Sequence, residues 1–127
     1  MAKQEKQTAA AVTAAILSTA QERTRLQELE RTYLLLFRER RQILEKCSPA
    51  EQQQFLDKYA AARVALTTAV ADGIANNDPV VEQFHHELVQ VNDRIETELQ
   101  GLRNIVAFLG LVTEAVKLMA AVAALGA

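Results

Sequence analysis

The stretches Ser-Pro-Ala-Glu at 48–51 and Asn-Asn-Asp-Pro at 76–79 contain the only two prolines of this 127-residue chain. In the first stretch, Ser48 can cap a helix N-terminus and Glu51 can complete a capping box, while the proline takes the first helical position, where its missing N–H costs nothing. In the second, Asp78 has the capping role. The sequence therefore predicts that new helices begin at both prolines.

The remaining composition restricts the fold to helices. The chain has four glycines and no tryptophan, and 50% of its residues are hydrophobic while 24% are charged. So few turn-forming residues leave too few chain reversals for a sandwich, a barrel or a doubly wound sheet. We therefore expect an all-α protein that forms a single helical domain over residues 1–127.

The spacing of the two prolines predicts an antiparallel bundle of three long helices, at about 3–46, 49–75 and 79–125. A break near 101–104, with an asparagine cap, would give four segments of matched length, as in a four-helix bundle. An isolated glycine costs only about 1 kcal/mol inside a helix, so we expect the third helix to continue through this region.

Apolar residues in the first helix recur at alternating spacings of three and four, as at Leu26, Leu29, Tyr33 and Leu36. This period predicts coiled-coil-like packing. The run 33–37 is apolar all round the helix, which indicates contacts on more than one side.

Three helices of such unequal length would leave residues 3–20 and 105–127 projecting from the bundle, and both segments carry few charges. Exposed apolar surface of this size calls for a partner. The residues predicted to face a partner or a membrane are Ile105, Phe108, Leu109, Val112, Val116, Met119, Val122, Val12 and Ile16. We expect Glu114 and Lys117 to lie on a polar strip at the edge of that surface.

These projecting segments predict a non-enzymatic interaction protein that forms a homo-oligomer or docks another helical protein. The alternative is a membrane-active protein, either a pore former or a bilayer-bound accessory subunit, that inserts residues 105–127. Two charges in that segment make its insertion near neutral or unfavourable, so this alternative is second.

Few residues point to chemistry. The sequence has no glycine-rich phosphate loop and no assembled nucleophile set, so we expect no enzyme, no cofactor and no small-molecule substrate. Glu82 and His85 have the Glu-x-x-His spacing of di-iron bundles. Two ligands do not fill a metal's coordination shell, so the remaining metal hypothesis is a Glu/His site shared between subunits.

The charge balance argues against nucleic acid as a partner. The chain has 14 basic and 16 acidic residues, with a net charge of −2, and therefore no overall basic field. The cluster 38–41 mixes arginines with a glutamate, which is typical of a solvated helix face. Arg40 falls on the core-facing stripe, where it would need a carboxylate from a neighbouring helix and would set the register between helices.

The single cysteine, Cys47, cannot form an intramolecular disulfide, which favours the cytoplasm. Two alternatives stay open. The protein is membrane-associated if residues 105–127 meet lipid, and secreted if residues 1–20 act as a signal peptide.

Overall fold

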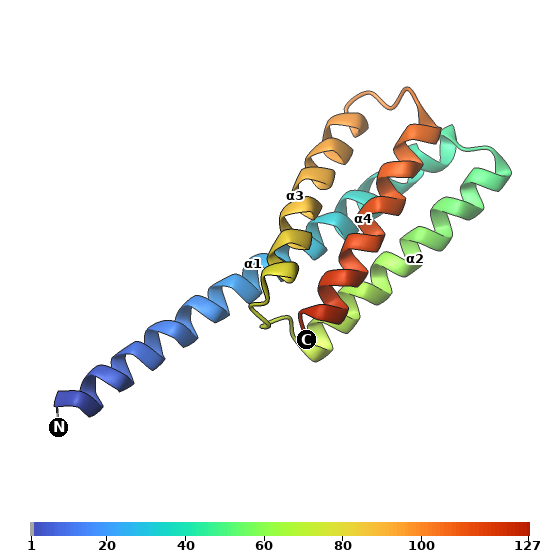
Figure 1. The fold of residues 1–127 in the computed structure, drawn as a ribbon. Helices are drawn as coiled ribbons and strands as arrows, with labels where there is room; N and C mark the ends of the chain where they lie inside the picture. The colour runs from blue at the N-terminus through green and yellow to red at the C-terminus, as the bar shows by residue number, and fades with distance from the viewer. Residues whose placement is uncertain (1) are drawn as a thin grey trace.

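The computed structural model describes the backbone of residues 2–127 and the side chains of residues 22–127. It confirms an all-α bundle, and the described backbone contains no strand. The helices pack side by side (Figure 1), and their bounds are α1, Ala2–Lys46; α2, Pro49–Asp72; α3, Pro79–Leu99; and α4, Ile105–Leu125.

The break near 101–104 is present, so the continuous third helix expected over 79–125 is replaced by α3 and α4. Asn104 has extended backbone angles (φ −121°, ψ 95°) and its side chain accepts a hydrogen bond from the N–H of Ala107 at 3.1 Å, which caps α4. Folding back lets α4 bury its apolar arc within the same chain, which a straight helix would leave exposed. The resulting α3 and α4 have 21 residues each, close to the 24 residues of α2.

The four helices alternate in direction along the chain (Figure 1). Helix α1 packs against α2 and α3, and α4 packs against the same two helices from the opposite corner. Among the described residues, the backbones of α2 and α3 do not approach each other closely, so these helices lie at opposite corners of the bundle. The connection from α2 to α3 must therefore cross the end of the bundle diagonally.

Both proline-containing caps form as the sequence predicts. The N–H of Glu51 donates to Ser48 Oγ at 3.3 Å, and the N–H of Ser48 donates to the Glu51 carboxylate at 2.8 Å, which closes the capping box. The N–H of Val80 donates to Asp78 Oδ1 at 2.9 Å. These caps satisfy backbone donors that have no partner within the helix.

The core lies between all four helices and is built from large aliphatic side chains and one phenylalanine each from α2 and α4. Its fully buried members are Leu29, Leu36, Ile43, Phe55, Ala62, Ala69, Ile74, Val81, Leu88, Ile95, Phe108, Val112, Ala115, Met119 and Val122. Helix α4 contacts each of the other three helices, which accounts for its high apolar content.

Helix α1 is much longer than the rest of the bundle. It has 45 residues, against 24 in α2, and its N-terminal half extends beyond the ends of the other helices (Figure 1). We call residues 2–21 the α1 extension. At 1.5 Å per residue, the whole helix is roughly 68 Å long, so the bundle covers only part of it.

Candidate interaction surface

The structure places the predicted C-terminal interface residues inside the bundle. Buried in the chain's own core are Phe108, Leu109, Val112, Val116, Met119 and Val122, while Ile105 is half-buried against the same core. Helix α4 is long and apolar enough to cross a membrane, the one such helix among the described residues, yet half of its most apolar window is buried inside the chain. Its apolar arc is therefore used intramolecularly.

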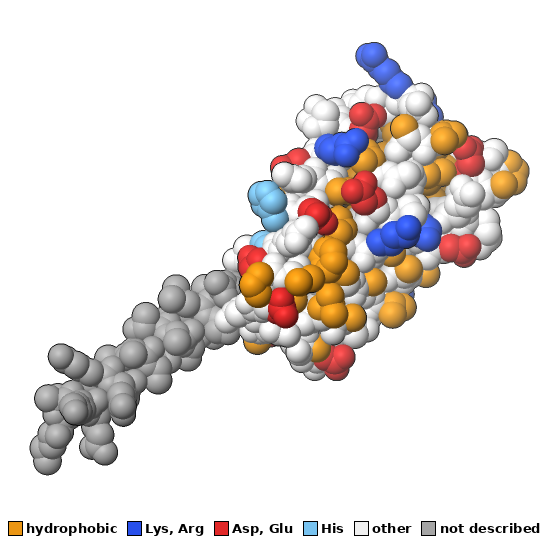
Figure 2. Space-filling model, viewed as in Figure 1, with side chains coloured by type: hydrophobic (Ala, Val, Ile, Leu, Met, Phe, Trp, Pro, Cys, Tyr) orange, Lys and Arg blue, Asp and Glu red, His pale blue; other side chains and the backbone are white. Residues whose placement is uncertain are grey.

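The polar strip lies on the solvent side of α4, where Glu114 and Lys117 are exposed. Acidic and basic side chains are interspersed over the face formed by α3 and α4, and hydrophobic atoms follow the seam between them (Figure 2). This face therefore presents no patch of one charge sign. Val12 and Ile16 lie outside the residues whose side chains the structure describes.

Glu82 and His85 do lie close together, with 3.9 Å between Glu82 Oε2 and His85 Nδ1. Glu82 is already engaged by an arginine through its other oxygen. Among the described residues there is no group of three or more histidine, cysteine or acidic side chains that could hold a metal ion. Among the described side chains, none forms a hydrogen bond with the buried Nε2 of His85.

That arginine is Arg25, which is fully buried and which the sequence reading missed. Its Nε donates to Glu82 Oε1 at 2.9 Å, and Nη2 donates to the same oxygen. Its Nη1 donates to the carbonyl oxygens of Ile74 and Asn76, both at 2.8 Å. Arg25 thus joins α1 to α3 and to the crossing connection, at the point where α1 leaves the bundle.

Arg40 does not have the buried position predicted for it. The side chain is exposed, its Nη1 donates to the carbonyl of Phe37 at 2.6 Å, and its Cζ lies 4.3 Å from the centroid of the Phe37 ring. Arg40 faces α2 near the rim, whereas the buried stripe of α1 passes through Arg25 and Thr32.

Thr32 and Asn92 form a second buried polar contact between α1 and α3. The Thr32 hydroxyl donates to Asn92 Oδ1 at 2.9 Å, and Asn92 Nδ2 donates to the Glu28 carboxylate at 2.9 Å. Arg31 then bridges Glu28, Asp93 and Glu96, at 2.7–2.9 Å. Burial by itself lowers the pKa of Arg31, but the hydrogen bonds to these carboxylates outweigh this effect, so the pKa of Arg31 is raised.

The outward face of α1 carries apolar side chains that the bundle does not cover. Phe37 is 41% exposed. Leu34 lines a surface hollow of about 300 Å³ together with Gln27, Glu30 and Arg38. The apolar run 33–37 predicted contacts on more than one side, and within this chain only its inner side is fully packed.

Toward α2, the same run forms an aromatic cluster. Tyr33 stacks on Tyr59 with 5.5 Å between ring centroids, and their hydroxyl oxygens lie 3.2 Å apart. Burial and the hydrogen bond with Tyr33 raise the pKa of the Tyr59 hydroxyl. Phe37 and Phe55 extend the stack at either end, with centroids 6.0 Å from Tyr33 and Tyr59 respectively. The cluster fixes the α1–α2 contact.

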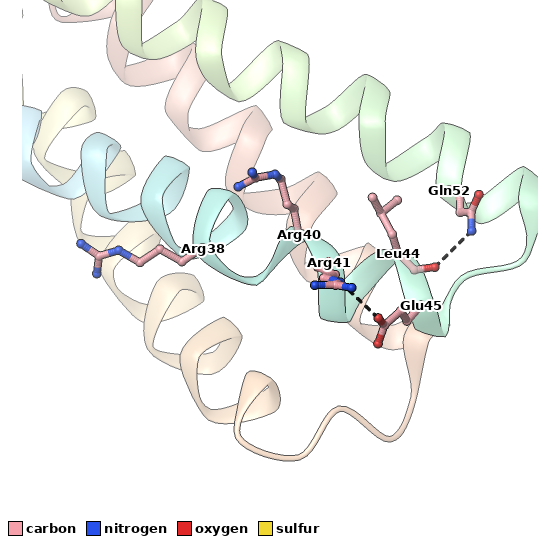
Figure 3. Close-up of a pocket in the computed structure, with 6 residues that line it drawn as sticks. All are labelled: Arg38, Arg40, Arg41, Leu44, Glu45 and Gln52. Carbon is pink, nitrogen blue, oxygen red and sulfur yellow. Dashed lines mark hydrogen bonds and ion pairs between the residues drawn. The ribbon is translucent and has the colours of Figure 1, made fainter.

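A second hollow, of about 590 Å³, lies near the C-terminal end of α1 and is lined by three arginines (Figure 3). Arg38, Arg40 and Arg41 leave the helix in different directions, so their guanidinium groups do not converge on one small anion. Arg41 is paired only loosely, with 3.6 Å between its Nε and Glu45 Oε1. The hollow is therefore part of a broad, basic stretch of helix surface.

Comparisons of this chain with protein-family models, with curated proteins and with solved structures found no match.

Proposed function

We propose that this protein is a non-enzymatic interaction protein that self-assembles through α1, with the four-helix bundle as its folded body. The observation that carries the proposal is the mismatch in length between α1, with 45 residues, and α2, with 24. The α1 extension is uncharged from residue 7 to residue 21. Among these residues, Val12, Ile16 and Leu17 and the surrounding alanines offer an apolar surface that favours a partner.

The C-terminal segment has a smaller part in this proposal than the sequence predicts. Because α4 fills the core, its buried apolar side chains can meet a partner only if the bundle opens. The contact with a partner then rests on the α1 extension, including Val12 and Ile16, and on the outward face of α1. Another helical protein is the alternative partner.

A membrane-active role is the second candidate, because α4 has the length and composition of a membrane span. Insertion would have to break the packing of α4 against α2 and α3, and it would carry Glu114 and Lys117 into lipid. Flotation with liposomes of neutral and anionic lipid distinguishes the two candidates. A membrane-active protein floats, whereas the proposed interaction protein stays in the dense fraction.

Self-assembly is tested on the full chain by light scattering coupled to size exclusion. We expect an oligomer whose mass falls to that of the monomer when Val12 and Ile16 are both replaced with aspartate, since buried charges oppose apolar association. The matched control is Val106→Asp, because Val106 lies on α4 and is 70% exposed. A full chain that stays monomeric at high micromolar concentration would contradict the proposal.

A further inference from the structure

We infer that the partner of α1 is the α1 helix of a second copy, packed antiparallel, with each extension lying on the outward face of the other copy's α1. The inference rests on the proposed self-assembly and specifies its surface and register. It starts from the outward residues that the bundle leaves uncovered, namely Arg23, Gln27, Glu30, Leu34, Phe37 and Arg41. All of them are exposed except Leu34, which is half-buried.

These outward residues follow the alternating spacings of three and four that define one face of a helix. Continued toward the N-terminus, the same side of a straight α-helix passes through Ala20, Ile16, Val12, Ala9 and Glu5, with two consecutive spacings of four on either side of Ile16. One stripe thus runs from residue 5 to residue 41, more than the three or four heptads that a coiled coil needs. Its N-terminal part holds the two apolar residues predicted for an interface, Val12 and Ile16.

Four pairs of stripe residues match when two copies run antiparallel with Arg23 at the two-fold axis, namely 5 with 41, 9 with 37, 12 with 34 and 16 with 30. Residues equally far from Arg23 on either side then meet. Val12 meets Leu34, which places an aliphatic side chain over the hollow beside Leu34. Ala9 meets Phe37, so that a small residue faces the part of the ring that Tyr33 and Arg40 leave exposed.

Arg23 meets its own copy at the axis, whereas the charges at the ends of the stripe are complementary in this register. Glu5 is the one acidic residue before residue 22, and it meets Arg41, whose only ion pair among the described side chains is the loose one to Glu45. A parallel pair would also place Arg23 against Arg23, and it would add repulsion of Glu5 by Glu5 and of Arg41 by Arg41. The antiparallel arrangement is therefore the favoured one.

Cysteine cross-linking tests the direction directly, in a Cys47→Ser background. Ile16 and Glu30 lie seven residues on either side of Arg23, so a mixture of Ile16→Cys chains and Glu30→Cys chains is expected to form mixed disulfide dimers under mild oxidation. In an antiparallel pair, two copies of residue 16 are separated by 14 residues, roughly 21 Å, which is beyond the reach of a disulfide. Disulfides between like chains would show a parallel pair and overturn the inference.

The matched control for cross-linking is Ala60→Cys, on the exposed side of α2. Mixed with Ile16→Cys chains, it is expected to give only background dimer. Equal yields from the control and from the Glu30→Cys chains would contradict the proposed surface.

Charge reversal tests the register. Glu5→Arg and Arg41→Glu are each expected to weaken association by about tenfold, because two symmetric pairs become repulsive, and the double variant is expected to recover most of the loss. The control Arg94→Glu, on the exposed face of α3, should leave association unchanged. Absence of rescue by the double variant would overturn this register.

The outcomes separate the two proposals. A full chain that is monomeric by light scattering contradicts both of them. A chain that forms dimers without mixed disulfides between residues 16 and 30 retains the proposed self-assembly and excludes the antiparallel α1 pair.

Discussion

Arg25 Nε lies 2.9 Å from Glu82 Oε1, so that a fully buried cation of α1 is neutralised by a carboxylate at the start of α3. The remaining donors of this guanidinium reach the carbonyls of Ile74 and Asn76 in the crossing connection. Because Glu82 is about half exposed, the pair lies at the border between core and solvent. It fixes the bundle where α1 continues outward.

Replacing Arg25 with methionine should lower the free energy of unfolding by about 2–4 kcal/mol, because two backbone carbonyls lose their donor while the aliphatic volume is kept. Urea denaturation followed by circular dichroism measures the change. The control is Arg94→Ala, at an exposed position on α3, for which we expect a change within about 0.5 kcal/mol. Equal effects of the two substitutions would show that the Arg25 contacts contribute nothing.

Val112→Asp should lower the free energy of unfolding by more than about 4 kcal/mol, because the new carboxylate would be buried without a partner. The substitution should therefore unfold the bundle itself. Val106→Asp, on the exposed side of the same helix, should leave the thermal midpoint nearly unchanged. A folded Val112→Asp variant would contradict the burial of α4.

Asn104→Ala should cost about 1 kcal/mol, because the N–H of Ala107 loses its cap. Chemical denaturation gives the value. Asn77→Ala, in the exposed part of the α2–α3 connection, provides a matched asparagine control and should be close to neutral. If both substitutions had the same effect, the cap would not stabilise the break between α3 and α4.

Cys47 should react slowly with iodoacetamide at pH 8. Burial and the nearby negative charge of Glu51 raise the pKa of its thiol, so less of the reactive thiolate is present at that pH. Glu51→Gln should lower this pKa and speed the reaction, while a glutamine oxygen can still accept the hydrogen bond from Ser48. Glu30→Gln, remote from the thiol, is the control. Superimposable pH–rate profiles for wild type and Glu51→Gln would contradict the assigned cause.

Much of the bundle could be predicted from local signals in the chain. The caps at Ser48 and Asp78 start α2 and α3 at the expected prolines, because capping depends on residues within one turn of each other. Asn104 was recognisable as a possible cap by the same logic. Residues near Asn104 do not decide whether the helix breaks there. A single glycine and one cap change the free-energy difference between a continuous and a broken helix by only about 1 kcal/mol each.

The candidate surface was harder to predict, because burial depends on which helices meet. Hydrophobicity ranks Arg25 and Thr32 as surface residues, yet both are fully buried, since acceptors on α3 and in the crossing connection satisfy them. Arg40 is the opposite case, because the sequence places it on an apolar stripe and yet its side chain is exposed. It lies over the Phe37 ring, beside the aromatic contact between α1 and α2.

The sequence by itself determined the helical class, the two proline caps and the apolar character of residues 105–125, because these follow from composition and from contacts within one helical turn. Only the tertiary structure decided that α4 folds back into the core, that Arg25 is the buried cation, and that the outward face of α1 is left uncovered. Those outcomes depend on side chains that belong to different helices, such as Arg25 and Glu82 with a separation of 57 residues. Such contacts stabilise the protein only once the helices have packed together, so the sequence of one helix does not reveal them.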